Sequence, residues 1–537
     1  MKGKWAIGVG VGVVVLLVIA HVRPIRWDLT DDKRYSLSEA TQALLKGLDE
    51  PLYIGCLMDG ELNSGFRRLK QAEEDLERDM SLYATIRPIV LSDEQKAGLG
   101  LKPTLIHERE RNGRTSQTEV YPYAVLSYKD RKAVIPLLSN NRSLSGEENL
   151  NNSIAGLEYA FAEAIHNVEK EDVPKIAFLE GHGELPESYV ADITTMLSRY
   201  FRVDRGALSG DAKALDGYKA VIIADPQEAF SEQDKYILDQ YIMRGGRVLW
   251  LVNGVRFSNE VLSREGYTPA IALDLNISDL LFQAGVRIEP ALVQDVQCLP
   301  VPVDVSGVAG EPNYQPMPWY YAPLLLTSQA SPITRNCMQV SATFASPVVA
   351  VGESEAIYKQ ILLASSTSSR LIPTPAQVDL TDMNPDMELF RYQFIPVAMA
   401  VEGCFRSAFA HRLTPEGLTN TEAIVPQSVK TRQIVMGAGS IIRNEREQGT
   451  TLPVGYDRYT GMQFGNRDVL VNSVLWLADD EGLMELRGKE VTLRLLNDRR
   501  SHELWTKIQV ITIVVPIVLL LMIAGIVAVV RKRKYTK

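Results

Sequence analysis

A run of 23 uncharged residues, 508–530, lies close to the C-terminal end of the sequence. At about 1.5 Å per residue, a helix of this length exceeds the roughly 30 Å hydrocarbon core of a bilayer. Pro516 does not oppose a helix, because neighbouring helices can satisfy the carbonyl that it frees. Four basic residues follow at 531–534, and positive charge beside a span marks its cytoplasmic side. The sequence therefore predicts a C-terminal transmembrane helix, 507–530, and a basic cytoplasmic tail, 531–537.

A second apolar run, residues 5–20, lies at the N-terminal end and is shorter than the usual span of about 20 residues. It fits either an uncleaved transmembrane anchor within 1–22 or a signal peptide with a weak cleavage site at 18–20. We favour the anchor. Two spans place both termini in the cytoplasm and the bulk of the chain, residues 23–506, in the periplasm, held at the inner (cytoplasmic) membrane in contact with lipid. Cleavage would leave that location unchanged.

The net charge and the spacing of the cysteines limit which functions the chain can have. Removing the seven lysines and arginines at the two ends changes the net charge from −9 to −16, so the rest of the chain should repel nucleic acid. The four cysteines have neither a CxxC pattern nor the spacing of zinc ligands, which predicts no metal site. They allow one disulfide, Cys298 to Cys337, or four small buried thiols that include Cys56 and Cys404, and both interpretations stay open.

Residues 23–148 are predicted to form a small α/β domain. Ser38 is the expected N-cap of its first helix, and apolar residues at spacings of three and four predict a second helix over 65–83. Strands are expected at 52–57, 86–91, 123–128 and 133–138. This β-α-β-then-ββ order favours a thioredoxin-like arrangement without redox cysteines. An amphipathic helix within 149–172 is predicted to link it to the next domain.

Residues 173–500 alternate apolar strands with helices. The strands are predicted at 175–179, 218–224 and 247–252, with helices near 187–200 and from the Ser231 capping box to Gly245. Apolar strands that alternate with helices indicate a doubly wound, flavodoxin-like parallel sheet covered on both faces.

The same domain is expected to contain insertions. The sheet resumes at 431–437, followed by a helix at 467–477, while strands near 362–365 and 396–402 lie in the region that is harder to interpret. The proline and aromatic cluster at 316–321 predicts long ordered loops. Its aromatic rings, Trp319 to Tyr321, could stack on a ligand, but packing onto a core is the favoured interpretation.

The best candidate site is the loop that follows the strand at 175–179. Glu180, His182 and Glu184 lie at the carboxyl end of a parallel strand, where open α/β sheets bind ligands, and Asp225 ends the neighbouring strand. These groups could bind a polar ligand, coordinate a metal or act as acid and base. The glycines between them also suit a purely structural turn, which we favour.

The energy for any transport is expected to come from another protein, and this chain is not expected to catalyse a reaction. The sequence has no GxxxxGK[ST] motif, so a separate ATPase must power any transport, and no cofactor is expected. None of the cysteines has the glycine-flanked strand-to-helix setting of a nucleophile. We therefore predict no catalytic residues and no enzyme activity, with an envelope hydrolase that uses the Glu180-His182-Glu184 loop as the least favoured alternative.

Several stretches together resemble one family, GldG, the auxiliary and putative substrate-binding component of the gliding-motility-associated ABC transporters of Bacteroidetes. The resemblance covers nearly the whole chain. It is specific because the matching stretches occur together, in this order, between two apolar ends. The matching stretches are Tyr35-Ser-Leu-Ser38 with Leu29-Thr30 before it, Asn152-Ser-Ile-Ala-Gly-Leu-Glu-Tyr159, Phe178-Leu-Glu-Gly-His-Gly-Glu184, Asp239-Gln-Tyr-Ile-Met-Arg-Gly-Gly246, Phe464-Gly-Asn-Arg467 with Asn472, and the RKRKY tail.

The resemblance implies a non-catalytic, extracytoplasmic auxiliary subunit of a membrane protein complex with a separate ATPase and a permease. Envelope or gliding-machinery proteins are further candidate partners, and delivery of a small polar solute to the transporter is the alternative function. It also implies a fold related to a domain of an intraflagellar-transport subunit. One departure is the stretch Gly437-Ala-Gly-Ser440, because the family usually has an acidic Asp-Gly-Asp after the strand near 435.

Overall fold

The computed structural model describes two parts of the chain. These are residues 36–484, with gaps at 61, 90, 92–98, 100, 102, 110–114, 139–144, 170–172, 305–312, 353–355, 381–384, 448, 481 and 483, and residues 512–528, with gaps at 519, 523 and 526.

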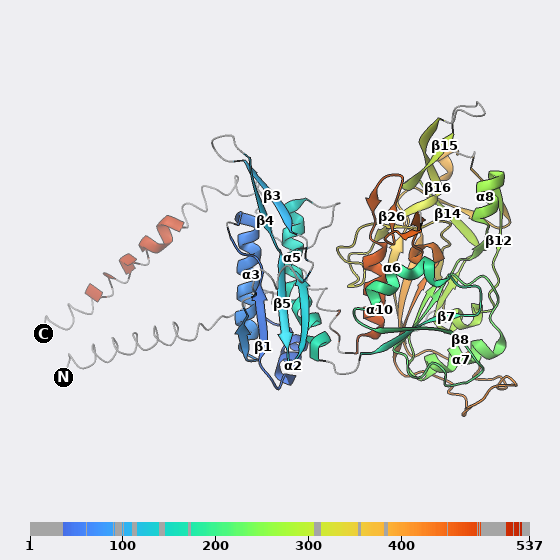
Figure 1. Ribbon diagram of the computed structural model, residues 1–537, viewed down its shortest axis with the longest axis horizontal. Coiled ribbons are helices and arrows are strands. Elements are labelled where there is room, and N and C mark those ends of the chain that lie inside the picture. The colour runs from blue at the N-terminus through green and yellow to red at the C-terminus, as the bar shows by residue number, and fades with distance from the viewer. Residues whose placement is uncertain are drawn as a thin grey trace. The chain divides into compact units, whose positions relative to one another are not determined.

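The N-terminal part of residues 36–484 is a small domain, a four-stranded sheet with helices packed on it (Figure 1). Its strands run in the order β2-β1-β5-β6, with β1 and β2 parallel and the other two pairs antiparallel, which agrees with the predicted β-α-β-then-ββ order. A separate hairpin joins β3 to β4. The elements are α2 (Glu39–Gly47), β1 (Leu52–Cys56), α3 (Ser64–Met80), β2 (Ile86–Pro88), β3 (Thr104–Arg109), β4 (Thr115–Val120), β5 (Tyr123–Tyr128), β6 (Arg131–Pro136) and α5 (Gly146–Glu169).

The helices of this part form where the sequence predicts them. The Ser38 side chain accepts a hydrogen bond from Thr41 N, so it caps α2 as expected. Asn63 caps α3 in the same way through Phe66 N. Helix α5 packs against α3 and along β5 and β6, so the predicted linking helix is an integral layer of this small domain.

The larger domain is built on a ten-stranded sheet. Five parallel strands run in the order β8-β7-β9-β10-β23, which is the flavodoxin-like order 2-1-3-4-5. The sheet then continues through antiparallel strands β22, β19 and β16, so it is mixed rather than wholly parallel. In chain order, the first elements of this domain are β7 (Lys175–Glu180), α6 (Glu187–Leu197), β8 (Arg202–Ala207), β9 (Ala220–Ala224), α7 (Glu232–Met243) and β10 (Val248–Leu251).

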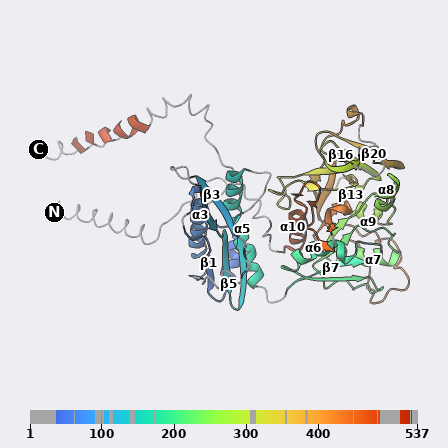
Figure 2. The ribbon, with the colours of Figure 1, turned by 45° about the horizontal axis from the view of Figure 1, so that its top comes forward.

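The antiparallel half comes from the region between β10 and β23. Both views place β16 at the opposite end of the domain from β7 and α7 (Figures 1 and 2). The elements here are β11 (Val255–Arg256), α8 (Asn259–Glu265), β12 (Tyr267–Ala272), α9 (Ser278–Gln283), β13 (Val286–Ile288), β14 (Ala291–Asp295), β15 (Cys298–Asp304), β16 (Tyr314–Thr327), β17 (Val340–Ser341), β18 (Val348–Ala350), β19 (Ile357–Ala364), β20 (Ser369–Pro373), β21 (Ala376–Asp379), η1 (Met387–Leu389) and β22 (Pro396–Gly403).

The last elements complete the parallel half and cover it. They are β23 (Thr431–Met436), η2 (Gly439–Ile442), β24 (Arg446–Glu447), β25 (Thr450–Thr451), β26 (Tyr456–Asp457), β27 (Met462–Gln463) and α10 (Asn466–Ala478). Alternate residues of β9 and β10 face opposite sides of the sheet. Val221 and Trp250 belong to the core that includes α7, whereas Ile222 and Leu249 belong to the core that includes α6 and α10. Both faces of the parallel strands are therefore buried, as a doubly wound sheet requires.

The 316–321 cluster is not a loop. It lies within β16, a strand of 14 residues, and Trp319 and Tyr321 are buried around Phe344. The loop prediction was wrong because this stretch of β16 pairs with β15 on one side, while β17 and β19 pair further along the strand, and prolines are compatible with one-sided pairing. The burial of both rings agrees with the packing interpretation of these aromatics.

Of the two predicted transmembrane helices, the C-terminal one is corrected by the structure. The N-terminal one, within 1–22, lies outside the described residues. For the C-terminal one, 507–530, none of the helices among the described residues is both long and apolar enough to cross a membrane.

All four cysteines are free thiols, so Cys298 and Cys337 form no disulfide. Cys337 is buried, and Cys56, Cys298 and Cys404 are partly buried. Burial, followed by the charge of Glu73, raises the pKa of the Cys56 thiol to about 12, which keeps it protonated. The small-thiol interpretation is therefore the one that the structure supports.

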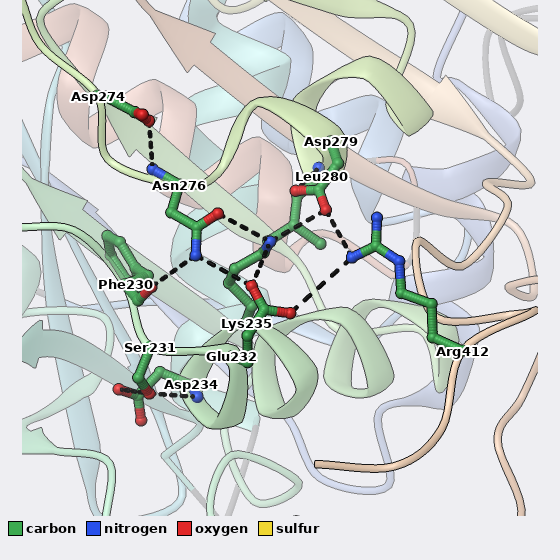
Figure 3. Close-up of polar contacts among 10 residues, drawn as sticks. All are labelled: Phe230, Ser231, Glu232, Asp234, Lys235, Asp274, Asn276, Asp279, Leu280 and Arg412. Atoms are coloured by element: carbon green, nitrogen blue, oxygen red, sulfur yellow. Dashed lines mark hydrogen bonds and ion pairs between the residues drawn. The ribbon is translucent and has the colours of Figure 1, made fainter.

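A buried lysine ties α7 to α9 (Figure 3). Lys235 is fully buried, and its Nζ lies 3.0 Å from Asp279 Oδ2, 3.1 Å from Glu232 Oε1 and 3.2 Å from Asn276 Oδ1. Arg412 adds a second cation 3.0 Å from the same Asp279 oxygen. A buried charge is tolerated only when it is paired and hydrogen-bonded, and this cluster meets that condition.

Candidate functional site

A cavity of about 670 Å³ lies at the carboxyl ends of the parallel strands. It is lined by residues of the loops that follow β7, β9, β10 and β23, including Glu184, Asp225, Asn253 and Arg443. Between β7 and β9 the strand order reverses direction, and open α/β sheets bind ligands beside such a topological switch point. We call this cavity the switch-point crevice. Its volume falls in the roughly 300–1,000 Å³ range of small-molecule sites.

His182 is buried beneath the crevice rather than exposed in it. Its Nδ1 lies 3.1 Å from Glu184 Oε1 and its Nε2 lies 3.2 Å from Asp234 Oδ2. The ring stacks on Phe230 with 3.7 Å between the ring centroids. Burial lowers the pKa of His182, but the hydrogen bonds and charges of Glu184 and Asp234 outweigh it and raise the pKa overall. Both ring nitrogens are thus engaged by the protein itself.

The two glycines beside His182 shape this turn. Gly181 and Gly183 have φ angles of 115° and 72°, a region that side chains rarely adopt. The turn lets the His182 carbonyl accept hydrogen bonds from the backbone N–H groups of Gln227 and Glu228, at 2.8 and 2.9 Å. The loop after β7 is therefore fastened to the loop after β9, which is the structural role that we favoured from the sequence.

The other predicted residues divide between the crevice and the surface. Glu184 lines the crevice and receives hydrogen bonds from His182. Asp225 also lines it. Glu180 does not line it, because it is the last residue of β7 and pairs with Arg205 of β8 at 2.8 Å. Of the four predicted residues, the structure brings only Glu184 and Asp225 to the crevice wall.

Asp225 is the most constrained of these groups. It adopts a φ of 55°, which is uncommon for a residue other than glycine, and its Oδ1 accepts hydrogen bonds from Asn253 at 2.6 Å and from Gln227 at 3.0 Å. Burial, opposed by the charge of Arg443, raises the pKa of the Asp225 carboxyl to about 6. Asn253 in turn accepts a hydrogen bond from Gly439 N at 3.0 Å, so the ends of β9, β10 and β23 are connected.

The glycine loop after β23 permits this connection. A Cβ added to Gly439 would lie 2.3 Å from the Asp225 carboxyl, and one added to Gly437 would lie 2.1 Å from Ser346 O. Only glycine allows such close approach at both positions. The stretch Gly437-Ala-Gly-Ser440 is therefore packed against the base of the crevice.

Sequence reasoning missed the crevice residues that follow β23 and β10. Arg443, Arg446 and Arg458 line the crevice, as do Asn253 and Asn466. The strand at 431–437 was predicted, and the rule that ligands gather at the carboxyl ends of parallel strands applies to its following loop as well. That rule would have found Arg443. Among the residues that the structure describes, no group of three or more His, Cys, Asp or Glu side chains could hold a metal ion.

Two family models match this chain. A family model described as an ABC-type uncharacterized transport system (ABC_transp_aux) matches residues 173–473, which is more than half of the chain. The chain belongs to this ABC-type transport auxiliary family. The matched region contains the whole parallel sheet and most of the crevice lining. A second model, a domain of unknown function (DUF7088), matches residues 31–127 in the small domain.

Other comparisons with this member of the ABC-type transport auxiliary family add little. No curated protein matches the chain. A solved structure titled "mmIFT52 N-terminal domain" is 15% identical, covers 57% of this chain and 98% of that chain, and has a TM-score of 0.33. A likeness at this level supports no statement about function.

Proposed function

We propose that this chain is a non-catalytic auxiliary subunit of an ABC-type transport system and works with a separate ATPase and permease. The observation that carries the proposal is the family match over residues 173–473. The site geometry agrees with a non-catalytic role, because His182 already uses both ring nitrogens within the protein. A general acid or base must instead reach its substrate by hydrogen bond.

The test is isolation of the complex. A tagged full-length chain, solubilised from membranes in mild detergent, should bring an ATPase and a permease with it, identified by mass spectrometry. An unrelated envelope protein that carries the same tag serves as the control. Recovery of neither subunit would contradict the proposal.

The GldG type, a role in gliding and the inner-membrane, periplasmic location belong to the same proposal and rest on the sequence resemblance. Deletion of the gene should abolish spreading of cells on agar, and the intact gene should restore it. Protease added to spheroplasts should digest the larger domain while a cytoplasmic marker stays intact. Normal spreading would argue against the gliding role, and protection of the domain would argue against the location.

A second candidate function is solute binding, and the switch-point crevice is the specific observation in its favour. A concave site of this volume at a topological switch point is where a doubly wound sheet binds small ligands. The crevice would then present a solute to the transporter. Stabilisation of the chain by a small molecule, lost on changes to crevice residues, would support this function.

A further inference from the structure

Charged side chains of both signs line the switch-point crevice, and they differ in whether the protein already pairs them. The four acidic residues are Glu184, Asp225, Glu445 and Asp457, and the three basic ones are Arg443, Arg446 and Arg458. The pairing of each group shows which sign of charge the crevice leaves to be neutralised by a ligand.

Each acidic residue has a partner within the protein. Glu184 accepts hydrogen bonds from the backbone N–H and the ring of His182, and Asp225 accepts them from Asn253 and Gln227. Asp457 accepts hydrogen bonds from the backbone and the hydroxyl of Thr460. Glu445 lies 3.4 Å from Arg458. The acidic groups are therefore satisfied before any ligand arrives.

Two of the arginines are not paired in this way. Among the residues that the structure describes, Arg443 and Arg446 form no ion pair within 4.0 Å and no hydrogen bond through their guanidinium groups. Arg443 is nonetheless held in place, because its Cζ lies 4.4 Å from the centre of the Tyr189 ring. A guanidinium stacked on an aromatic ring keeps its planar fork of donors available for a carboxylate or a phosphate.

The rest of the lining suits an organic body attached to such a group. Phe257, Tyr456 and Leu299 supply apolar surface, while Gln227 and Asn259 supply amide groups. Apolar walls with a few convergent polar groups are typical of sites for small organic molecules.

We propose that the switch-point crevice binds a small organic anion whose phosphate or carboxylate group is held between Arg443 and Arg446. The proposal rests on the solute-binding candidate above and gives it a ligand class. The anionic group supplies the direct ion pair that neither arginine has among the described residues, beside the more distant charges of Asp225 and Glu445 that already act on Arg443. Hydroxyl groups on the ligand body can pair with the amides of Gln227 and Asn259.

Four probes test the proposal on the purified full-length chain: glucose 6-phosphate, glucuronate, neutral glucose and inorganic phosphate. Thermal shift and titration calorimetry should show glucose 6-phosphate or glucuronate binding at least tenfold more tightly than glucose. Which of the two binds better identifies the preferred anionic group. Binding should weaken as salt is raised, because exposed charges are screened.

The matched variants are R443Q/R446Q and, as a control that removes one arginine outside the crevice lining, R264Q on α8, where Arg264 pairs with Glu265. Hydrogen bonds to charged groups are strong enough that the double variant should bind the anionic probe at least tenfold more weakly. Its unliganded melting temperature should equal that of the parent chain, since both arginines are exposed. The R264Q chain should bind normally.

Three outcomes would overturn the proposal, and they separate it from the function on which it rests. If glucose binds as tightly as the anions, the crevice is a solute site but not an anion site. If R443Q/R446Q binds the anion as well as the parent chain, the anion lies elsewhere. If no probe binds while the ATPase and permease still co-isolate, the subunit role stands and the solute site falls.

Discussion

Glu73 gives the sharpest test of the physical argument in the small domain. Its side chain is fully buried on α3, and neither carboxyl oxygen has a hydrogen-bond partner among the described residues. Burial, followed by the charge of Glu77, raises the pKa of Glu73 from 4.5 to about 8. The folded domain therefore keeps a proton that the unfolded chain releases.

The sign and size of the effect follow from this pKa. Between pH 4.5 and about 8 the folded state binds more protons than the unfolded state, so the free energy of unfolding falls as the pH rises. At about 1.4 kcal/mol per pH unit, the full loss is about 5 kcal/mol. Glu73→Gln keeps the shape and removes the titration. The variant should match the parent near pH 4.5 and exceed its stability by about 2–5 kcal/mol at pH 8.

Hydrogen exchange by mass spectrometry measures this locally. Peptides that cover α3 and β1 should open more easily in the parent chain as the pH rises, after correction for intrinsic exchange rates, and Glu73→Gln should remove that dependence. Glu74→Gln is the matched control, because Glu74 is the next residue and is exposed. If the parent and Glu73→Gln chains show the same pH dependence, the buried carboxyl does not hold its proton and the reasoning fails.

Three further predictions concern the larger domain. Lys235→Met should lower the free energy of unfolding by about 2 kcal/mol in urea, because it removes the buried cation that pairs with partly buried Asp279 and with Glu232. Lys213→Met, in an exposed pair, should cost under about 1 kcal/mol, and equal losses would contradict this. His182→Ala should destabilise most below pH 6.5, since the raised pKa of His182 makes its contribution full there and smaller as the pH rises; a loss that is constant from pH 5.5 to 9 would refute it. Gly439→Ala should cost about 1–3 kcal/mol through its clash with Asp225, and an unchanged melting temperature would show that the loop can yield.

The parallel half of the larger sheet could be predicted from the sequence because its signals are local. The strands β7, β9 and β10 contain short apolar runs between turn residues, and the burial of β9, of β10 and of residues 176–179 in β7 explains why these runs lack polar alternation. The Ser231 side chain accepts a hydrogen bond from Asp234 N at 3.1 Å, which confirms the helix start predicted from the capping pattern. Each of these features is decided within about ten residues of chain.

In the antiparallel half, the strands expected near 362–365 and 396–402 overlap β19 and β22, but their pairing could not be predicted because it is not local. Strand β19 lies between β16 and β22, and its pairing with β22 contains two register shifts, which disturb the alternation that a sequence pattern needs. Strand β16 contains prolines that argue against a strand when the sequence is considered alone. The partners of these strands, and not their own residues, determine their structure.

The candidate site was predicted only in part, because the sequence indicates where the site lies but not how its side chains are directed. The carboxyl-end rule locates the edge of the sheet, and Glu184 and Asp225 do line the crevice there. It does not determine which way each side chain turns. Glu180 still belongs to the strand and pairs with Arg205, whereas His182 is turned inward on a backbone that two glycines make possible.

The glycine loop after β23 also bears on what the crevice can bind. The resemblance to GldG leads us to expect an acidic Asp-Gly-Asp in this stretch, and this chain has Gly437-Ala-Gly-Ser440. Because even a Cβ at position 439 would lie 2.3 Å from the Asp225 carboxyl, an acidic side chain does not fit there without moving Asp225. The loop thus adds no further carboxylate to the four acidic residues that line the crevice.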